Sequence, residues 1–383
     1  MTKKQIRFGI IGLGLMGREF ASAAARWLHL LDLDFVPVIT GICDKNEALF
    51  DWYTSNIDTI TVKTTDYNDL LNSDHVDAIY CAVPHNLHQQ FYIDIITSGK
   101  ALLGEKPFGM DVAQNTSIMQ TIAANPDVFV ACSSEFPFFP GAQRVIQAIR
   151  ENEFGQIIDV EAGFLHSSDI NPDKTINWKR MVDINGRYGC MGDLGLHVFH
   201  VPLRFGWQPK NVRALLSNIM TERYNADGDL VPCETWDNAT LVCEVESADH
   251  GNFPMTLKTY RIAPGETNTW YININGTRKS VRFSTRQPKT FYTMDYEPGG
   301  KQVWAEESMG YDTAYKTITG GIFEFGFSDS LLQMWAAFCD EMVNGRDGMR
   351  QPFYCATPDE AAAHHRVLTA ALESEKQAAV IGV

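Results

Sequence analysis

The feature that most constrains the fold is a strand pattern that runs directly into a glycine-rich turn. Residues 7–17 read RFGIIGLGLMG, and a helical pattern continues from there to about Leu30. In a dinucleotide site the first glycine permits a tight turn, the second lets the backbone approach a pyrophosphate, and the third lets the helix pack on the strand. The helix N-terminus also favours phosphate. The alternative is a tight turn without a ligand. We expect the dinucleotide to contact Gly12, Gly14, Leu15, Met16 and Gly17.

Strand patterns alternate with helical patterns through the first third of the chain. This alternation indicates right-handed crossovers and a doubly wound parallel sheet, which we assign to a nucleotide-binding Rossmann domain at residues 1–133. The strand patterns are Ile6–Ile11, Val36–Cys43, Ile60–Val62, Ala78–Val83, Ala101–Leu103 and Val128–Cys132.

After about Cys132 the pattern changes to alternating strands with fewer helices between them. We expect residues 134–383 to form a second, α+β domain built on a mostly antiparallel sheet. Helical patterns at Ser328–Met342 and Pro358–Ser374 close the chain, and residues 297–321 read as a long surface loop. The strand patterns are Val212–Ser217, Thr240–Val245, Met255–Arg261, Trp270–Asn275 and Ser280–Thr285.

Composition excludes several classes of partner. The 383 residues carry a net charge of −15, which disfavours nucleic acid and anionic membranes because both attract clustered Lys and Arg. No apolar run is long enough to span a membrane, and no signal peptide is visible. The eight cysteines lie at least ten residues apart, without a CxxC pair. We therefore expect a cytoplasmic protein with reduced thiols and no bound metal.

Polar residues follow the second and fourth strand patterns, where the carboxyl edge of the sheet would bind a ligand. Asp44 stands where an acid accepts hydrogen bonds from the adenosine ribose, although it is 32 residues from Gly12 rather than about 20. It favours NAD, while the adjacent Lys45 leaves NADP possible. The loop AVPHNLHQQ (82–90) contributes Pro84, Asn86 and His88 as candidate cofactor contacts, with a helix cap as the alternative reading of Asn86.

The fifth strand pattern ends in LLGEKPFG (102–109), which places Glu105 and Lys106 at the same edge. Pro107 restricts the backbone of Lys106 and so aims its side chain. We expect both residues to lie at the cofactor site.

The segment GRYGCMGDLGLHVFH (186–200) is the second informative stretch. Asp193 and His197 are four apart, so they share one face of a helix. Glycines at the start of that helix let a ligand come close, and a carboxylate beside an imidazole suits acid–base chemistry near neutral pH. A DxxxH pair alone is more often structural.

The motifs GLGLMG, EKPFG and GDLGLH, in this order, resemble those of the glucose–fructose oxidoreductase, inositol dehydrogenase and rhizopine-catabolism (Gfo/Idh/MocA) family. The resemblance covers nearly the whole chain and implies NAD(P)-dependent chemistry on sugars or polyols. It also implies that the sheet of residues 134–383 is large and open, that this domain binds substrate, and that the sheet joins copies of the chain in homodimers or homotetramers. It implies that Lys106 binds the reacting oxygen, that Asp193 and His197 complete the catalytic set, and that Asp44 binds ribose. In the 82–90 loop His85 takes the usual Asn place, and Ser134 and Glu135 stand where many members have Arg.

The segment HSSDINPDKTINWKR (166–180) resembles the substrate loop of the family's sugar and anhydrosugar dehydrogenases. An acid, an aromatic face and a guanidinium suit a polyhydroxylated ring. The implied substrate-binding residues are Lys106, His166, Asp169, Trp178, Arg180, Asp193 and His197.

Three functions agree with these residues. The first is an NAD(P)-dependent dehydrogenase that oxidises a secondary hydroxyl, or reduces the ketone, of a sugar, anhydrosugar or polyol. The second is an NAD-dependent glycoside hydrolase that uses the cofactor transiently. The third is a non-catalytic NAD-sensing regulator, which retention of Lys106, Asp193 and His197 disfavours. The sequence leaves open the sugar, the carbon oxidised and the direction of reaction.

Overall fold

A computed structural model describes residues 3–310 and 312–383, and the chain divides into two compact units. The first comprises Met1–Gly109, Ala113–Phe138 and Tyr311–Pro358. The second comprises Met110–Val112, Phe139–Gly310 and Asp359–Val383. Residues 312–358 thus belong to the first unit, whereas the sequence analysis placed them in the second domain. Each unit is described by itself.

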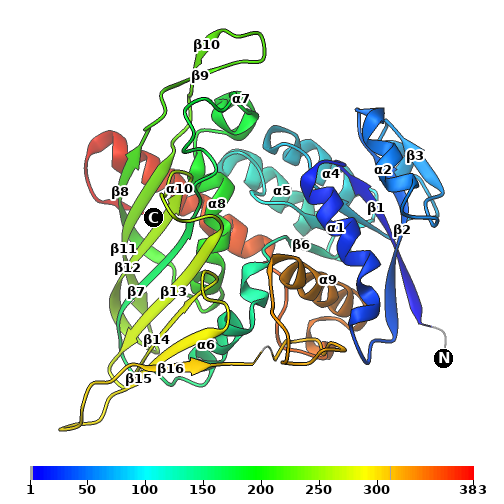
Figure 1. Cartoon of the computed structure of the whole chain (residues 1–383). Coiled ribbons are helices and arrows are strands. Elements are labelled where there is room, and N and C mark those ends of the chain that lie inside the picture. Colours follow the sequence, from blue (N-terminus) through cyan, green and yellow to red (C-terminus); the bar gives the residue numbers. More distant parts are fainter. Residues whose placement is uncertain (1–2, 311) are drawn as a thin grey trace. The chain divides into compact units, whose positions relative to one another are not determined.

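The first unit is built on a six-stranded sheet in the order β3-β2-β1-β4-β5-β6, with every pair parallel (Figure 1). This confirms the doubly wound parallel sheet. Its strands are β1 (Lys4–Ile11), β2 (Phe35–Cys43), β3 (Val62–Thr64), β4 (Ala78–Cys81), β5 (Ala101–Gly104) and β6 (Val130–Cys132).

Helix α9 (Phe327–Asn344) completes the core of the first unit, because its apolar side chains pack against the sheet and α1. Trp335 lies 3.8 Å from the ring of Phe20 on α1 and 5.1 Å from the ring of Phe8 on β1, measured between ring centroids. The other helical elements are α1 (Leu15–Ala25), η1 (Trp27–His29), η2 (Glu47–Leu49), α2 (Phe50–Thr54), α3 (Asn68–Leu71), η3 (His85–Leu87), α4 (His88–Thr97), α5 (Val112–Ala124), η4 (Phe136–Phe138) and η6 (Arg346–Gly348).

The second unit is built on a nine-stranded sheet in the order β16-β15-β14-β13-β7-β12-β11-β8-β17. Only the β7–β12 pair is parallel, so the expected large, mostly antiparallel sheet is confirmed. The strands are β7 (Ile157–Leu165), β8 (Pro209–Ser217), β11 (Asn238–Ser247), β12 (Gly251–Tyr260), β13 (Thr269–Gly276), β14 (Lys279–Ser284), β15 (Thr290–Asp295), β16 (Ala305–Ser308) and β17 (Ile381–Gly382), and β9 (Glu222–Tyr224) pairs separately with β10 (Leu230–Pro232).

One face of this sheet is covered by helix α8 (Cys190–Arg204), which packs on β7, β11 and β12. Burial alternates along β11 and β12, so the opposite face stays partly exposed. The expected loop at 297–321 is wrong in part, because β16 lies within it; position 311 is outside the described residues. The remaining helical elements are α6 (Pro140–Arg150), η5 (Trp178–Arg180), α7 (Val182–Asn185) and α10 (Pro358–Gln377).

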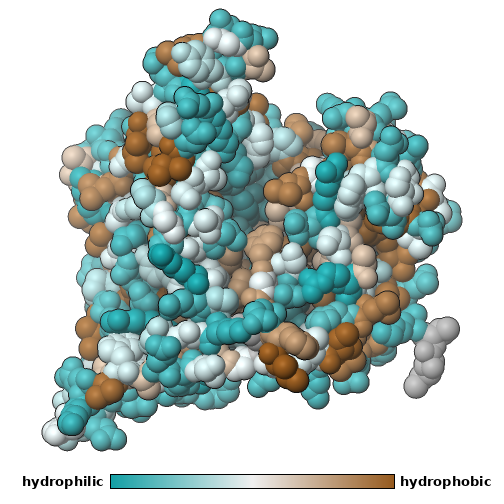
Figure 2. Space-filling model, viewed as in Figure 1, coloured by the Kyte–Doolittle hydropathy of each residue, from teal (hydrophilic) through white to brown (hydrophobic). Residues whose placement is uncertain are grey.

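Three further observations concern membrane-spanning helices, the surface and the cysteines. Within residues 3–310 and 312–383, no helix combines the length and apolar character that a membrane crossing requires. Figure 2 shows hydrophobic side chains in small separate patches among hydrophilic ones on the face in view. All eight cysteines are buried and reduced.

Candidate functional site: a nucleotide edge and an Asp–His helix

The glycine turn of the first unit is shaped by close backbone contacts. A Cβ on Gly12, whose φ is +93°, would lie 2.5 Å from the carbonyl oxygen of Ala82. A Cβ on Gly17 would lie 2.3 Å from the carbonyl oxygen of Gly12. Gly14 differs, since no protein atom within 4 Å faces its Cβ position. The open space beside Gly14, at the N-terminus of α1, is the space that a pyrophosphate needs.

We expect Gly14→Ala to weaken NADH binding by about tenfold or more, roughly 1.4 kcal/mol, because the added methyl occupies space reserved for the phosphates. Its melting temperature should stay near that of the wild type, since the methyl meets no protein atom. Gly12→Ala is the matched comparison and should lower the melting temperature, because it is strained at positive φ. Calorimetric titration and thermal melting measure both effects. Unchanged NADH affinity in Gly14→Ala would contradict this reading of the turn.

Asp44, directly after β2, is fixed by two main-chain donors. The amide of Leu13 donates to one carboxylate oxygen at 2.8 Å, and the amide of Asn46 donates to the other at 2.9 Å. The first bond ties the acid to the glycine turn, 31 residues away along the chain. The structure therefore brings Asp44 to the cofactor turn despite the long sequence separation.

In the segment after β4, Pro84 and Asn86 are exposed, whereas His88 is buried. The ring nitrogens of His88 lie 2.5 Å from the carbonyl oxygen of Pro107 and 2.9 Å from that of Val83. Burial lowers the pKa of His88 to about 4, so the ring is neutral at neutral pH and donates its single N–H to one of these two carbonyl oxygens. Both nitrogens face the protein, which suits a role in holding the loop after β4 against the loop after β5.

Glu105 and Lys106 follow β5, and the amide of Glu105 donates to the carbonyl of Cys81 at the end of β4 at 3.0 Å. They therefore lie at the same carboxyl edge as the glycine turn. The side chain of Glu105 is buried and accepts a hydrogen bond from the hydroxyl of Tyr80 at 2.7 Å. Lys106 is half-buried, and its peptide bond to Pro107 is cis.

In the second unit, helix α8 carries Asp193 in its first turn and His197 one turn later. Both are nearly enclosed, at 2% and 4% exposure. The indole nitrogen of Trp270 donates to the carbonyl oxygen of His197 at 2.7 Å, and the ring of Phe164 lies edge-on to the imidazole with centroids 5.2 Å apart. Strands β7 and β13 thus fix the position of His197.

The carboxylate of Asp193 is balanced by two cations that the sequence analysis did not single out. Lys179 Nζ and Arg261 Nη2 each lie 2.9 Å from the same carboxylate oxygen. Arg261 is buried, whereas the side chain of Lys179 is 40% exposed. Lys179 stands in the NWKR segment that the analysis did select, but nothing in the sequence marks Arg261.

Arg180 lies inside the protein rather than at a surface. Its guanidinium pairs with Asp169, at 3.0 Å, and with Asp237, and it has no exposed side-chain surface. Burial lowers the pKa of Arg180, and the carboxylate of Asp169 opposes that shift. Asp169 also accepts a bond from Lys174 at 2.7 Å. The two predicted substrate residues are therefore engaged with each other, and they anchor the loop that carries Lys179.

The two remaining candidates, His166 and Trp178, are half-buried. The ring of His166 lies 4.6 Å from that of Phe164, which also contacts His197. The ammonium of Lys179 lies 5.7 Å from the centroid of the Trp178 ring. Within the second unit, His166 is therefore linked to His197 through Phe164, and Trp178 to Asp193 through Lys179.

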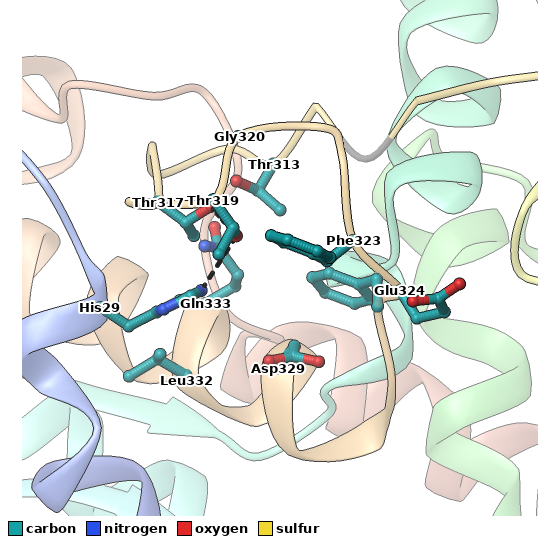
Figure 3. A pocket seen from close by; sticks show the side chains of 11 residues that line it. His29, Thr313, Thr317, Thr319, Gly320, Phe323, Glu324, Asp329, Leu332 and Gln333 are labelled. Atoms are coloured by element: carbon teal, nitrogen blue, oxygen red, sulfur yellow. Dashed lines mark hydrogen bonds between the residues drawn. The ribbon is translucent and has the colours of Figure 1, made fainter.

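Figure 3 shows a separate hollow in the first unit, where His29 and Thr319 approach each other at 3.4 Å. His29 ends η1, which precedes β2, so this hollow lies at the amino edge of the sheet, opposite the glycine turn. In the parts of the chain that the structure describes, no three His, Cys, Asp or Glu side chains are grouped to hold a metal ion.

Two protein-family models match this chain, one after the other along the sequence. Residues 6–132 match the model of an oxidoreductase family with an NAD-binding Rossmann fold, and residues 142–282 match the GFO/IDH/MocA C-terminal domain. The chain belongs to the Gfo/Idh/MocA family of oxidoreductases and binds NAD.

Three relatives bear on the chemistry. Levoglucosan dehydrogenase of Pseudarthrobacter phenanthrenivorans is 21% identical over 338 residues, which are 80% of this chain and 85% of that protein. A solved levoglucosan dehydrogenase in complex with NADH and levoglucosan has a TM-score of 0.87 at 18% identity, covering 99% of this chain and 100% of that one. An alpha-N-acetylgalactosaminidase of Shewanella oneidensis is 25% identical over 187 residues, 45% of this chain and 39% of that protein.

Proposed function

We propose that the protein is an NAD-dependent dehydrogenase that oxidises a secondary hydroxyl of a sugar, anhydrosugar or polyol, or catalyses the reverse reduction. The observation that carries this proposal is the nearly enclosed Asp193–His197 pair, with the carboxylate balanced by Lys179 and Arg261. Such a pair suits proton transfer from an alcohol. The similarity to levoglucosan dehydrogenase supports an anhydrosugar or a related ring as the substrate class.

Each catalytic residue has a distinct role in this proposal. Lys106 donates a hydrogen bond to the reacting oxygen and stabilises the negative charge that develops on it. His197 removes the hydroxyl proton. Asp193, which forms ion pairs with Lys179 and Arg261, sets the charge near His197. Bound NAD supplies the hydride acceptor.

The chain's other residues hold the cofactor and the substrate. The open space at Gly14 and the anchored carboxylate of Asp44 fit the pyrophosphate and the ribose. We assign the exposed Pro84 and Asn86 to the cofactor and the enclosed His88 to support of their loop. In the second unit, Lys179, Trp178 and His166 are the substrate contacts that we favour, since Arg180 and Asp169 are engaged with each other.

The cellular context is part of the same proposal. Eight buried, reduced cysteines suit a cytoplasmic enzyme. The partly exposed face of the nine-stranded sheet carries Leu215 and Val242 at 58% and 45% exposure. We propose that this face joins copies of the chain in a homodimer or homotetramer.

An NAD-dependent glycoside hydrolase is the second candidate, favoured by the similarity to the alpha-N-acetylgalactosaminidase. That similarity covers less than half of either protein. The two candidates share the cofactor and differ in whether NADH accumulates.

A substrate panel tests the proposal. Purified protein is mixed with hexoses, inositols, anhydrosugars and glycosides, each with NAD and then with NADP, and nicotinamide absorbance is recorded. Reduction of NAD with one substrate group is the expected result. Sugar release from glycosides without net reduction would instead support the hydrolase.

The same assay checks cofactor choice. We expect NAD to be used in preference to NADP, because the carboxylate of Asp44 would repel a 2′-phosphate. Asp44→Ala should lower kcat/KM for NAD by about tenfold, the worth of one hydrogen bond to a charged group. Asp51→Ala, at an exposed acid on α2, is the control and should change little. Equal use of NAD and NADP by the wild type would remove Asp44 from this role.

A further inference from the structure

Two buried acids, Glu105 and Glu135, lie at the same end of the sheet as Lys106, and neither has a role in the function proposed above. Glu105 follows β5, and Glu135 comes three residues after β6. These neighbouring strands are parallel, and the amide of Ser133 donates to the carbonyl of Gly104 at 2.9 Å, so both acids lie at the same end of the sheet. They are 7% and 4% exposed.

The titratable groups described around Glu135 come from the ends of neighbouring strands. Glu105 and Lys106 act on it electrostatically from the end of β5. Tyr80 on β4 interacts with both acids and donates its hydroxyl to Glu105 at 2.7 Å. Two contacts with α9 lie close by: the rings of Phe136 and Phe327 pack with centroids 6.1 Å apart, and the hydroxyl of Ser133 donates to the sulfur of Met334 at 3.7 Å.

This arrangement disfavours the ionisation of Glu135. Burial raises the pKa of Glu135 to about 8, and the charge of Glu105 adds to that shift. A hydrogen bond from the backbone of Glu135 itself and the charge of Lys106 oppose the shift. Two carboxyl groups that share a poorly solvated site rarely both ionise, because the charge on one raises the free energy needed to ionise the other. Near neutral pH, Glu135 therefore holds a proton.

The charge on Glu135 matters for Lys106. When Glu135 is neutral, it does not attract the ammonium of Lys106. The positive charge of Lys106 then stabilises a developing oxyanion more strongly. When Glu135 is ionised, its carboxylate attracts the ammonium and weakens that stabilisation.

We propose that Glu135 is a positioning residue that keeps a proton while the enzyme works, and that its ionisation sets the alkaline limit of the reaction through Lys106. The proposal rests on the proposed function, in which Lys106 acts on the reacting oxygen.

The variant Glu135→Gln tests the buried proton without any substrate. The wild type binds one more proton when folded than when unfolded between about pH 4.5 and about pH 8, so its stability must fall relative to the variant as pH rises through that window. The difference in melting temperature between the wild type and Glu135→Gln should therefore grow up to about pH 8 and stay constant above it. Ser134→Ala, a neutral change one residue away, is the control and should show a constant difference. A constant difference for Glu135→Gln as well would overturn the proposal.

The wild type alone gives a second readout if the variant folds poorly. Infrared spectra should show a protonated-carboxyl band that disappears between about pH 7 and about pH 9. Its absence would overturn the proposal, whatever reaction the protein catalyses.

The coupling to Lys106 is read from the pH dependence of kcat. The kcat of the wild type should fall above about pH 8. One to two pH units above that value, the kcat of Glu135→Gln, relative to its own value at neutral pH, should exceed that of the wild type by about tenfold. An unchanged alkaline limb in Glu135→Gln would overturn the coupling even if the melting data confirm the proton. If no substrate is turned over at all, the melting and infrared results stand, and the failure lies with the proposed function.

Discussion

Replacing His197 by alanine is expected to lower turnover by about 10²–10⁴-fold, the usual worth of a general base. The imidazole is the group on α8 that takes the hydroxyl proton in the proposed reaction, and Phe164 and Trp270 fix its position. NADH affinity should stay near the wild-type value, because the glycine turn and Asp44 are untouched. Initial rates and calorimetric titration measure these quantities separately.

Two further measurements make the His197 test specific. Added imidazole should restore part of the turnover of His197→Ala, because the missing side chain leaves a space of matching shape. His250→Asn is the control, since this histidine of the same unit packs on Trp207 and bonds to the carbonyl of Gly155 at 3.1 Å. Wild-type turnover in His197→Ala would remove His197 from the role of base.

Lys106→Ala should reduce turnover by about 10³-fold, the scale found when a donor to a developing oxyanion is removed. The loss should appear in kcat rather than only in KM, because the interaction strengthens as charge develops on the oxygen. Single-turnover rates at saturating NAD and substrate distinguish the two.

Lys100 provides the matched control for Lys106, because the two lysines flank β5 at opposite ends. Lys100 donates to the carbonyl oxygens of Ser73 and Val76 at 2.8 and 2.6 Å, at the amino edge of the sheet. Lys100→Ala should therefore keep its turnover, even where stability falls. Similar turnover in both variants would discredit the assignment of Lys106.

The parts of the fold that were predictable depend on local signals. The glycine turn and the alternation of strands and helices specify a parallel sheet, because each crossover is encoded within a few tens of residues. Helix α9 was predicted as a helix, but its packing partner was not. Its apolar face fits Phe8 and Phe20, about three hundred residues earlier, and periodicity does not name a distant partner.

The site shows the same limit at the scale of single residues. Asp193 and His197 were predictable because four residues make one helical turn. Arg180 and Lys179 are neighbours in a 3₁₀ turn, and the sequence does not tell which one lies inside and which one reaches Asp193. Arg261 comes from just beyond the end of β12, so only the folded sheet brings it to Asp193.

The central claim is that the protein carries out net transfer of hydride from a sugar hydroxyl to NAD. The most direct test is to measure, in one reaction, the NADH formed and the carbohydrate consumed, with levoglucosan as the first substrate and the best glycoside of the panel as the second. We predict about one NADH for each substrate molecule consumed, which is the stoichiometry of a dehydrogenase. Consumption of a glycoside with release of free sugar and no accumulated NADH would contradict the account.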